Sequence, residues 1–277
     1  MIRSQEAFTA TVVNATADDA DPRIKEVLSS LIRNLHNFVQ EVGLTLDEFV
    51  AGCQFMARAG KMSNETRNEF ILIANILGIE VLIDRISPRG GEQTTVLGPM
   101  HRADAPRYAN GSSIVLTENK DAETIFVEGH VRDASGAPIA GATVDVWQAG
   151  ANGLYDVQDP AQDDLNLRGL FTTDAAGYYS LICVRPAGYP IPDDGPGGDL
   201  LRMTKRHPMR PAHIHFIVSA PGKNPIVSQL YDASCKYIDN DAIFAVKDQI
   251  IVDFEPAGGR SKTDLYLQYD WKLSEAK

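Results

Sequence analysis

The sequence predicts an α+β protein with a helical front part and a β-rich body. Before about residue 90, apolar residues recur at the spacing of amphipathic helices, for example from Ile24 to Val42. After Pro88-Arg89-Gly90-Gly91, short β-prone runs alternate with Gly, Pro and Asp. We therefore expect a helical domain over residues 1–90 and an antiparallel β-sandwich over residues 91–277.

The composition is that of a globular protein and argues against two classes of partner. The 277 residues can bury a sizeable core, and their formal net charge of −11 disfavours nucleic acid and anionic membrane surfaces. Residues 1–10 lack the apolar segment of a signal peptide, and the longest apolar run, residues 70–83, is too short for a membrane span. Three widely spaced cysteines suit reduced thiols, so we expect a cytoplasmic location.

Three helices are expected in the front part. Asp21-Pro22 opens the first helix, and Gly43 ends it. Thr45-Leu46-Asp47-Glu48 is a capping box that opens the second. The third begins near Ser63 or Asn64 and runs to about Asp84. Asn75 lies in its apolar middle, so this residue is either a hydrogen-bonded core residue or part of a pocket.

Short strands are expected at regular intervals in the body, separated by turn-forming segments. They are Ile125 to Val131, Ala142 to Trp147, Gly169 to Thr173, Tyr178 to Val184, Arg210 to Phe216, Ile226 to Tyr231, Gln249 to Phe254 and Thr263 to Tyr269.

The strand from Arg210 to Phe216 carries the clearest chemical signal. Its period of two places His213 and His215 on one face. Neutral imidazole is a common ligand of transition metals, so the two histidines could be half of a metal site. The alternative is a pair of exposed histidines on a strand edge.

Two kinds of residue could complete such a site. Asp156 or Asp174 would give a ferrous site with two histidines and one carboxylate. Tyr155 and Tyr189 would instead offer phenolate oxygens, hard anionic donors that favour ferric iron. Packing of the two tyrosines in turns is the alternative interpretation.

Four segments, in this order along the chain, resemble the intradiol ring-cleavage dioxygenases. They are Leu154-Tyr155-Asp156, Gly169 to Tyr179, Arg185 to Pro192, and Arg210 to His215. The similarity covers nearly the whole chain, and the helical front part resembles the linker domain of catechol and hydroxyquinol 1,2-dioxygenases. That resemblance implies a homodimer formed through the N-terminal helices, whose interface can hold a phospholipid.

The resemblance also implies the chemistry of the site. It implies a non-haem Fe(III) ion held by Tyr155, Tyr189, His213 and His215. Tyr189 would accept a proton from the substrate. Arg210 would stabilise negative charge on the substrate, and Gln229 would lie beside the site.

The substrate pocket implied by the resemblance is lined by Leu72, Asn75, Leu97, Gly98, Pro99, Ile191, Pro192 and Arg210. The run Val96-Leu97-Gly98-Pro99 resembles the hydroxyquinol enzymes, since catechol enzymes more often carry a glutamate before the Gly-Pro. Two residues depart from the pattern: Met100 stands where aromatic residues are usual, and Asn75 stands where the pattern Leu-Ser-Asp-x-Leu-Gly has aspartate.

We expect cleavage of hydroxyquinol (benzene-1,2,4-triol) by O2 to 3-hydroxy-cis,cis-muconate, the enol form of maleylacetate. Catechol, pyrogallol or a substituted catechol are alternative substrates. A ferrous extradiol or facial-triad oxygenase, and a non-catalytic β-sandwich binding protein, are alternatives of different kinds.

Overall fold

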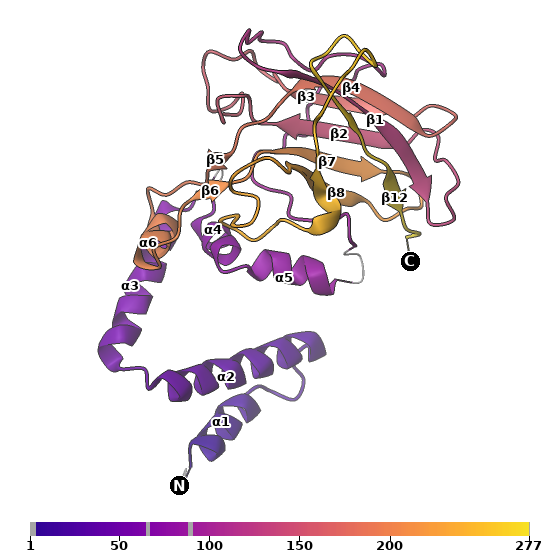
Figure 1. Ribbon diagram of the computed structural model, residues 1–277. Helices are drawn as coiled ribbons and strands as arrows, with labels where there is room; N and C mark the ends of the chain where they lie inside the picture. The colour runs from indigo at the N-terminus through magenta and orange to yellow at the C-terminus, as the bar shows by residue number, and fades with distance from the viewer. Residues whose placement is uncertain (1–3, 65–66, 88–90, 277) are drawn as a thin grey trace. The chain divides into compact units, whose positions relative to one another are not determined.

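The computed structural model describes residues 4–64, 67–87 and 91–276, and it confirms the α+β class, with helices first and strands after them (Figure 1). The chain folds as two compact units, Met1–Lys61 and Met62–Lys277. Residues 88–90 of the expected hinge lie outside the described residues, and a domain boundary at residue 90 stays a prediction.

The first unit is helical. Its helices are α1 (Gln5–Asn14), α2 (Pro22–Val42) and α3 (Leu46–Met62). The α2 helix begins and ends where its caps predict, because Asp21 accepts two backbone hydrogen bonds at 2.9 Å and Gly43 has a left-handed φ of 62°. The expected capping box forms at the start of α3, where the Glu48 carboxylate accepts a 2.9 Å hydrogen bond from the Thr45 N–H.

The apolar stripe of α2 is largely uncovered within the described chain. Its large side chains are 41–56% exposed, and the one buried residue described on this helix is Ser29. The members of the stripe are Ile24, Val27, Leu28, Leu31, Leu35, Phe38, Val39 and Val42. An apolar surface of this size on one helix is typical of an interface with another chain.

The prediction of a single third helix is wrong, because two short helices occupy that stretch. They are α4 (Glu69–Ile76) and α5 (Ile79–Ile86). Asn68 caps α4, whose first N–H groups donate to its side chain, so the helix begins later than Ser63 or Asn64. Gly78 has a φ of 72° and ends the α-helical path between the two helices.

The second unit contains two five-stranded sheets and a two-stranded ribbon (Figure 1). The first sheet holds β1 (Thr124–Asp133), β4 (Tyr178–Val184), β10 (Glu255–Pro256), β11 (Leu265–Gln268) and β12 (Trp271–Leu273). The second holds β2 (Thr143–Gln148), β3 (Arg168–Thr172), β7 (His213–Ser219), β8 (Ile226–Asp232) and β9 (Ile251–Val252). The ribbon pairs β5 (Tyr189–Pro190) with β6 (Met209–Arg210).

The sheets are mixed, which corrects the expectation of purely antiparallel pairing. The β1 strand pairs antiparallel with β4 but parallel with both β11 and β12, and β8 pairs parallel with β9. In each parallel pair, a long connection lets the later strand return in the same direction as its neighbour. Apolar side chains from both sheets meet in one buried cluster, including Val127, Leu181, Val144 and Phe216.

Two local expectations in the body are corrected, and one helix is added. The strand expected from Arg210 to Phe216 is interrupted after β6, because Pro211 has no N–H to continue the ladder, and β7 begins at His213. The start of the strand expected at Gln249 is the short 3-10 helix η1 (Asp248–Ile250). Helix α6 (Pro196–Met203) is an addition, and Gly197 and Gly198 in its first turn hide its helical pattern. No helix in the described ranges is long and apolar enough to cross a membrane.

Leu230→Ala should lower the free energy of unfolding by about 3 kcal/mol, because Leu230 is fully buried between the sheets. Leu116→Ala is the matched control. Its side chain is 43% exposed, and we expect a loss below about 1 kcal/mol. Urea unfolding followed by circular dichroism measures both values. Equal losses would contradict the assignment of Leu230 to the core.

Candidate active site

Four side-chain atoms from Tyr155, Tyr189, His213 and His215 converge on one point. The Tyr155 hydroxyl lies 3.0 Å from the Tyr189 hydroxyl and 2.9 Å from His215 Nε2. His213 Nε2 lies 3.2 Å from the Tyr189 hydroxyl and 3.1 Å from His215 Nε2. Each of the four atoms therefore neighbours two of the others in a closed ring.

Strand geometry and one glycine bring these residues together. His213 and His215 are two residues apart on β7, so both point to the same face of the sheet. Tyr189 opens β5, which pairs with Arg210 of β6. Tyr155 lies in the loop between β2 and β3. In that loop Gly153 has a φ of 80°, and a Cβ there would lie 3.3 Å from Tyr189 Cβ, so the absence of a side chain allows close approach.

The surroundings of both histidines favour their neutral form. His213 Nδ1 lies 2.7 Å from the Pro211 carbonyl oxygen, to which it donates, and this bond leaves a lone pair on Nε2. Burial, and then the positive charge of Arg210, hold the pKa of His213 well below its usual value. Burial, followed by the charges of His213 and Arg210, does the same to the pKa of His215. The indole of Trp147 stacks on the His215 ring, with 4.6 Å between centroids.

The two tyrosines differ in their surroundings. Tyr155 is 1% exposed, and burial raises the pKa of its hydroxyl well above the usual value, as does the neighbouring Tyr189. The Arg168 guanidinium lies 5.9 Å from the Tyr155 ring centroid, and its charge favours the phenolate. Tyr189 is half-buried on a two-residue strand. The Tyr155 side chain is therefore the more firmly enclosed.

Arg210 is a buried cation beside the ring of four atoms. It is 3% exposed and forms an ion pair with Asp241, with 3.2 Å between Arg210 Nε and Asp241 Oδ1. Its Nη2 donates to Gln229 and Tyr231 at 2.7 Å each, and its Nη1 lies 3.3 Å from His213 Nε2. Burial alone would lower the pKa of Arg210, but the charge and hydrogen bond of Asp241, together with Tyr231 and Tyr189, outweigh it and hold the pKa well above the usual range.

Gln229 is fully buried and lies next to His215 in the β7–β8 register. Its side-chain oxygen accepts from Arg210, and its amide donates to the Val96 carbonyl oxygen at 2.7 Å. Gln229 thus ties Arg210 to the segment around Leu97.

The carboxylates considered from the sequence have other partners. Asp156 and Arg168 form an ion pair in which each side chain is 1% exposed, and Arg102 also contacts Asp156. Asp174 accepts backbone hydrogen bonds in an exposed turn. In the described parts of the chain, no three His, Cys, Asp or Glu residues lie close enough to hold a metal ion. The site with two histidines and one carboxylate is therefore not formed.

The expected pocket residues are less closely gathered. Gly98 lies against His215, because a Cβ at Gly98 would be 3.1 Å from His215 Cε1. Ile191 is buried just after Tyr189, while Leu97, Pro99 and Pro192 are exposed. Leu72 and Asn75 lie on α4, where Asn75 Oδ1 is buried without a hydrogen-bond partner.

The sequence pattern does not point to Tyr231, Asp241 or Arg168. Tyr231 and Asp241 complete the hydrogen bonds of Arg210, and Arg168 donates to Asp156 in the loop of Tyr155. A charged residue at the start of a buried strand is a signal for Arg168, since such a charge needs a partner. Nothing local marks Asp241, which lies 31 residues from Arg210.

Comparison with known proteins gives a consistent result. A family model described as "Catechol dioxygenase N terminus" matches residues 21–95, and a second described as "Dioxygenase" matches residues 96–275. A hydroxyquinol 1,2-dioxygenase of Rhizobium sp. is 44% identical over 91% of this chain and 86% of its own length. A catechol 1,2-dioxygenase of Candida albicans is 42% identical over 97% of this chain and 90% of its own length.

A solved structure agrees with these relatives. The hydroxyquinol 1,2-dioxygenase of Pseudomonas putida superposes with a TM-score of 0.90 at 34% identity, over 98% of this chain and 99% of that one. The matched models and relatives together span both the helical part and the β body. The chain therefore belongs to the intradiol ring-cleavage dioxygenases.

Proposed function

We propose that this dioxygenase binds a non-haem Fe(III) ion through Tyr155, Tyr189, His213 and His215. The observation that supports it is the ring of four lone-pair-bearing atoms, with neighbours 2.9–3.2 Å apart. His213 Nε2 and His215 Nε2 lie 3.1 Å apart, and each also has a tyrosine hydroxyl within 3.2 Å, so the four atoms could present their lone pairs to one cation. Two hard phenol oxygens on the same point suit a highly charged cation.

When bound, ferric iron would lower the pKa of coordinated phenol and water and hold the substrate as a dianion. Tyr189 Oη is the atom best placed to take a substrate proton, because its side chain is half-buried and carried by a two-residue strand. Tyr155 stays in place, since it is enclosed beneath Arg168. The Arg210 guanidinium stabilises negative charge on the substrate, and Gln229 fixes its direction.

We further propose hydroxyquinol as the substrate, cleaved by O2 between its adjacent hydroxyl-bearing carbons to 3-hydroxy-cis,cis-muconate. Asn75 Oδ1 supports this choice, because a buried acceptor without a donor is costly until a donor reaches it. The third hydroxyl group of hydroxyquinol is such a donor, and catechol has none. This chain is 44% identical to a relative named for hydroxyquinol and 42% identical to one named for catechol, so catechol is the alternative substrate.

Iron binding by the tyrosines predicts a coloured protein. The iron-loaded protein should show a visible tyrosinate-to-iron charge-transfer band, and Tyr189→Phe or Tyr155→Phe should weaken this band and abolish turnover. Tyr178→Phe is the matched control, because the Tyr178 hydroxyl donates to Glu128 away from the four ligands. Absorption spectra and oxygen uptake measure these effects. A colourless protein whose activity depends on ferrous iron would contradict the proposal.

Asn75→Ala should lower kcat/KM for hydroxyquinol about tenfold, the worth of one hydrogen bond. The value for catechol should change less than about twofold, because catechol has no third hydroxyl group. Leu77→Ala, in the turn after α4 and 58% exposed, is the control for local disturbance and should change neither. Equal losses for both substrates would rule out a specificity role for Asn75.

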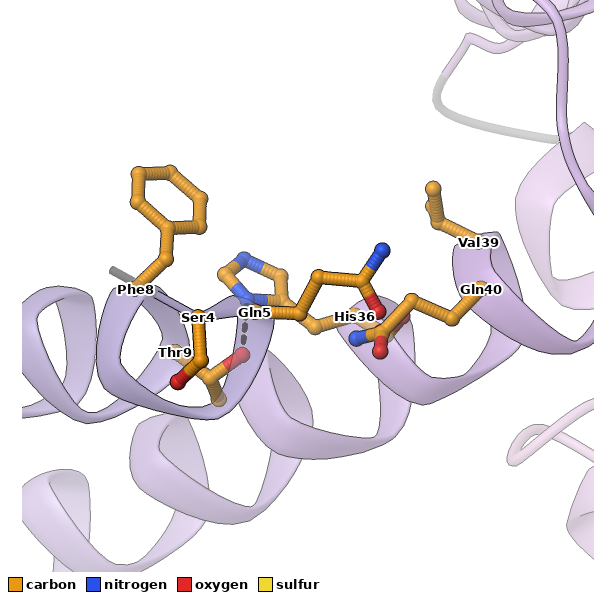
Figure 2. Close-up of a pocket in the computed structure, with 7 residues that line it drawn as sticks. All are labelled: Ser4, Gln5, Phe8, Thr9, His36, Val39 and Gln40. Carbon is orange, nitrogen blue, oxygen red and sulfur yellow. Dashed lines mark hydrogen bonds between the residues drawn. The ribbon is translucent and has the colours of Figure 1, made fainter. Parts of the chain in front are cut away.

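We propose a homodimer formed through the helical unit. The supporting observation is the stripe on α2, whose apolar side chains are 41–56% exposed. A hollow of about 600 Å³ lies between α1 and α2. Figure 2 shows the side chains that line it. Its walls are Ser4, Gln5, Phe8, Thr9, His36, Val39 and Gln40. Phe8 and Val39 offer apolar surface to an acyl chain, the polar residues around them could meet a headgroup, and we propose a phospholipid there.

Leu35→Glu should convert the dimer to a monomer, because the new carboxylate would have to leave water at the centre of the apolar stripe. Asn34→Glu introduces the same charge at an exposed polar position of α2 and should leave the dimer intact. Sedimentation equilibrium distinguishes the two states. A monomeric parent protein, or a dimer that tolerates Leu35→Glu, would count against this interface.

Two broader assignments are also proposals. We propose a dimerisation domain over residues 1–90 and a catalytic domain over residues 91–277. In support, the first family model ends at residue 95 and the second begins at residue 96, close to this boundary. A cytoplasmic location is supported by three free cysteines, Cys53, Cys183 and Cys235.

A further inference from the structure

We propose that Trp147 is a positioning residue that holds the His215 imidazole by ring stacking, in place of the hydrogen bond that holds His213. His101 in turn restrains the Trp147 indole. This role rests on the proposed function, because it concerns how the site keeps one of its four ligands in place for Fe(III). Trp147 itself is not expected to touch iron or substrate.

The two histidines differ in what orients their rings. His213 Nδ1 donates to the Pro211 carbonyl oxygen at 2.7 Å. His215 Nδ1 is also buried, but no atom of the described residues accepts a hydrogen bond from it. An imidazole that binds a metal through Nε2 is almost always oriented by a hydrogen bond from its other ring nitrogen. The orientation of the His215 ring therefore has to come from another contact.

Trp147 supplies that contact from the neighbouring strand. Its indole stacks on the His215 ring, with 4.6 Å between centroids and 11° between the ring planes. The two residues lie directly opposite each other in the β2–β7 register, so the backbone pairing of the sheet sets the spacing of the rings. Arg168 lies opposite Trp147 on β3, and Gln229 lies opposite His215 on β8. The four residues form one row across four strands, each at 0–1% exposure.

The unpaired indole N–H indicates that the ring of Trp147 matters here rather than its polar atom. Trp147 Nε1 is buried without an acceptor among the described residues. A buried indole N–H usually has a partner, and leaving it unpaired costs free energy. The other tryptophan, Trp271, follows this rule and donates from Nε1 to the Tyr179 hydroxyl at 3.0 Å. Contacts of the Trp147 ring have to offset that cost, and the stack on His215 is one of them.

His101 restrains the indole from a separate segment. Its ring meets the Trp147 ring at 64°, with 4.8 Å between centroids. His101 Nε2 lies 2.9 Å from Asp145 Oδ2, and Asp145 is on the same face of β2 as Trp147. Three residues earlier in the chain, Gly98 lies against His215, because a Cβ at Gly98 would be 3.1 Å from His215 Cε1. One short segment therefore contacts both rings of the stack.

The test measures how fast iron leaves the loaded protein for an excess of an Fe(III) chelator, followed as loss of the visible charge-transfer band. Trp147→Leu removes the flat ring, so iron release should be about tenfold faster. Trp147→Phe keeps a flat ring against His215, and its release rate should stay within about threefold of the parent rate. His101→Ala frees the indole at a position whose side chain is 24% exposed, and should speed release about threefold.

Trp271→Leu is the matched control, because Trp271 is equally buried and its ring neighbours are Phe216 and Tyr269. It should lower the free energy of unfolding by an amount similar to Trp147→Leu, as urea unfolding of the iron-free proteins measures. Its iron release should change less than about twofold, because no proposed ligand loses a contact.

Crystal structures of the iron-free proteins give a measurement that does not depend on metal. The His215 ring should have one orientation in the parent protein and in Trp147→Phe, and more than one in Trp147→Leu. A single orientation in Trp147→Leu would overturn the role of Trp147.

The outcomes separate this role from the proposed function. A parent protein that takes up Fe(III) without a charge-transfer band would make the proposed function wrong, and the His215 orientations in iron-free crystals would still decide the role of Trp147. If the band is present and iron release is unchanged in Trp147→Leu and His101→Ala, only the role of Trp147 is overturned. Equal acceleration in Trp271→Leu would overturn it too, since a loosened core would then explain the effect. If Trp147→Leu does not fold, an unchanged rate in His101→Ala overturns the proposal.

Discussion

The candidate active site depends on one buried positive charge that has to be paired. Arg210 lies on β6 and is 3% exposed, and an unpaired guanidinium at that burial would be strongly destabilising. Its partners come from separate segments: Asp241 from a late loop, Gln229 and Tyr231 from β8, and His213 from β7. Satisfying this single cation therefore fixes the relative positions of the strands and loops that carry the proposed ligands.

A second buried ion pair, between Asp156 and Arg168, positions the loop that carries Tyr155. Asp156 directly follows Tyr155 in the chain, and its bond to Arg168 anchors the loop between β2 and β3. Arg168 also donates to the Met100 carbonyl oxygen, so the loop of Tyr155 is tied to the segment that contains Gly98. Asp156, which the sequence offered as a possible metal ligand, instead holds the neighbouring Tyr155 in position.

The strand period predicts that the two histidines share a face, and the resemblance to the intradiol dioxygenases, carried by short local motifs, predicts that the two tyrosines join them. The sequence does not predict the pairing of Arg210 with Asp241, since contact across 31 residues depends on tertiary folding. The parallel partners of β1 and the break at Gly78 are missed for related reasons. A strand pattern carries no direction of pairing, and one glycine in an apolar run is compatible with a continuous helix.

Gly98 limits how this pocket can change in evolution. Its φ of 77° and the 3.1 Å from its missing Cβ to His215 mean that any larger residue would strain the backbone and push on the imidazole. The surface beside His215 is therefore main chain, which point substitution cannot reshape. In the proposed pocket, we therefore expect changes of substrate to arise at the neighbouring Leu97 and on α4 rather than at Gly98.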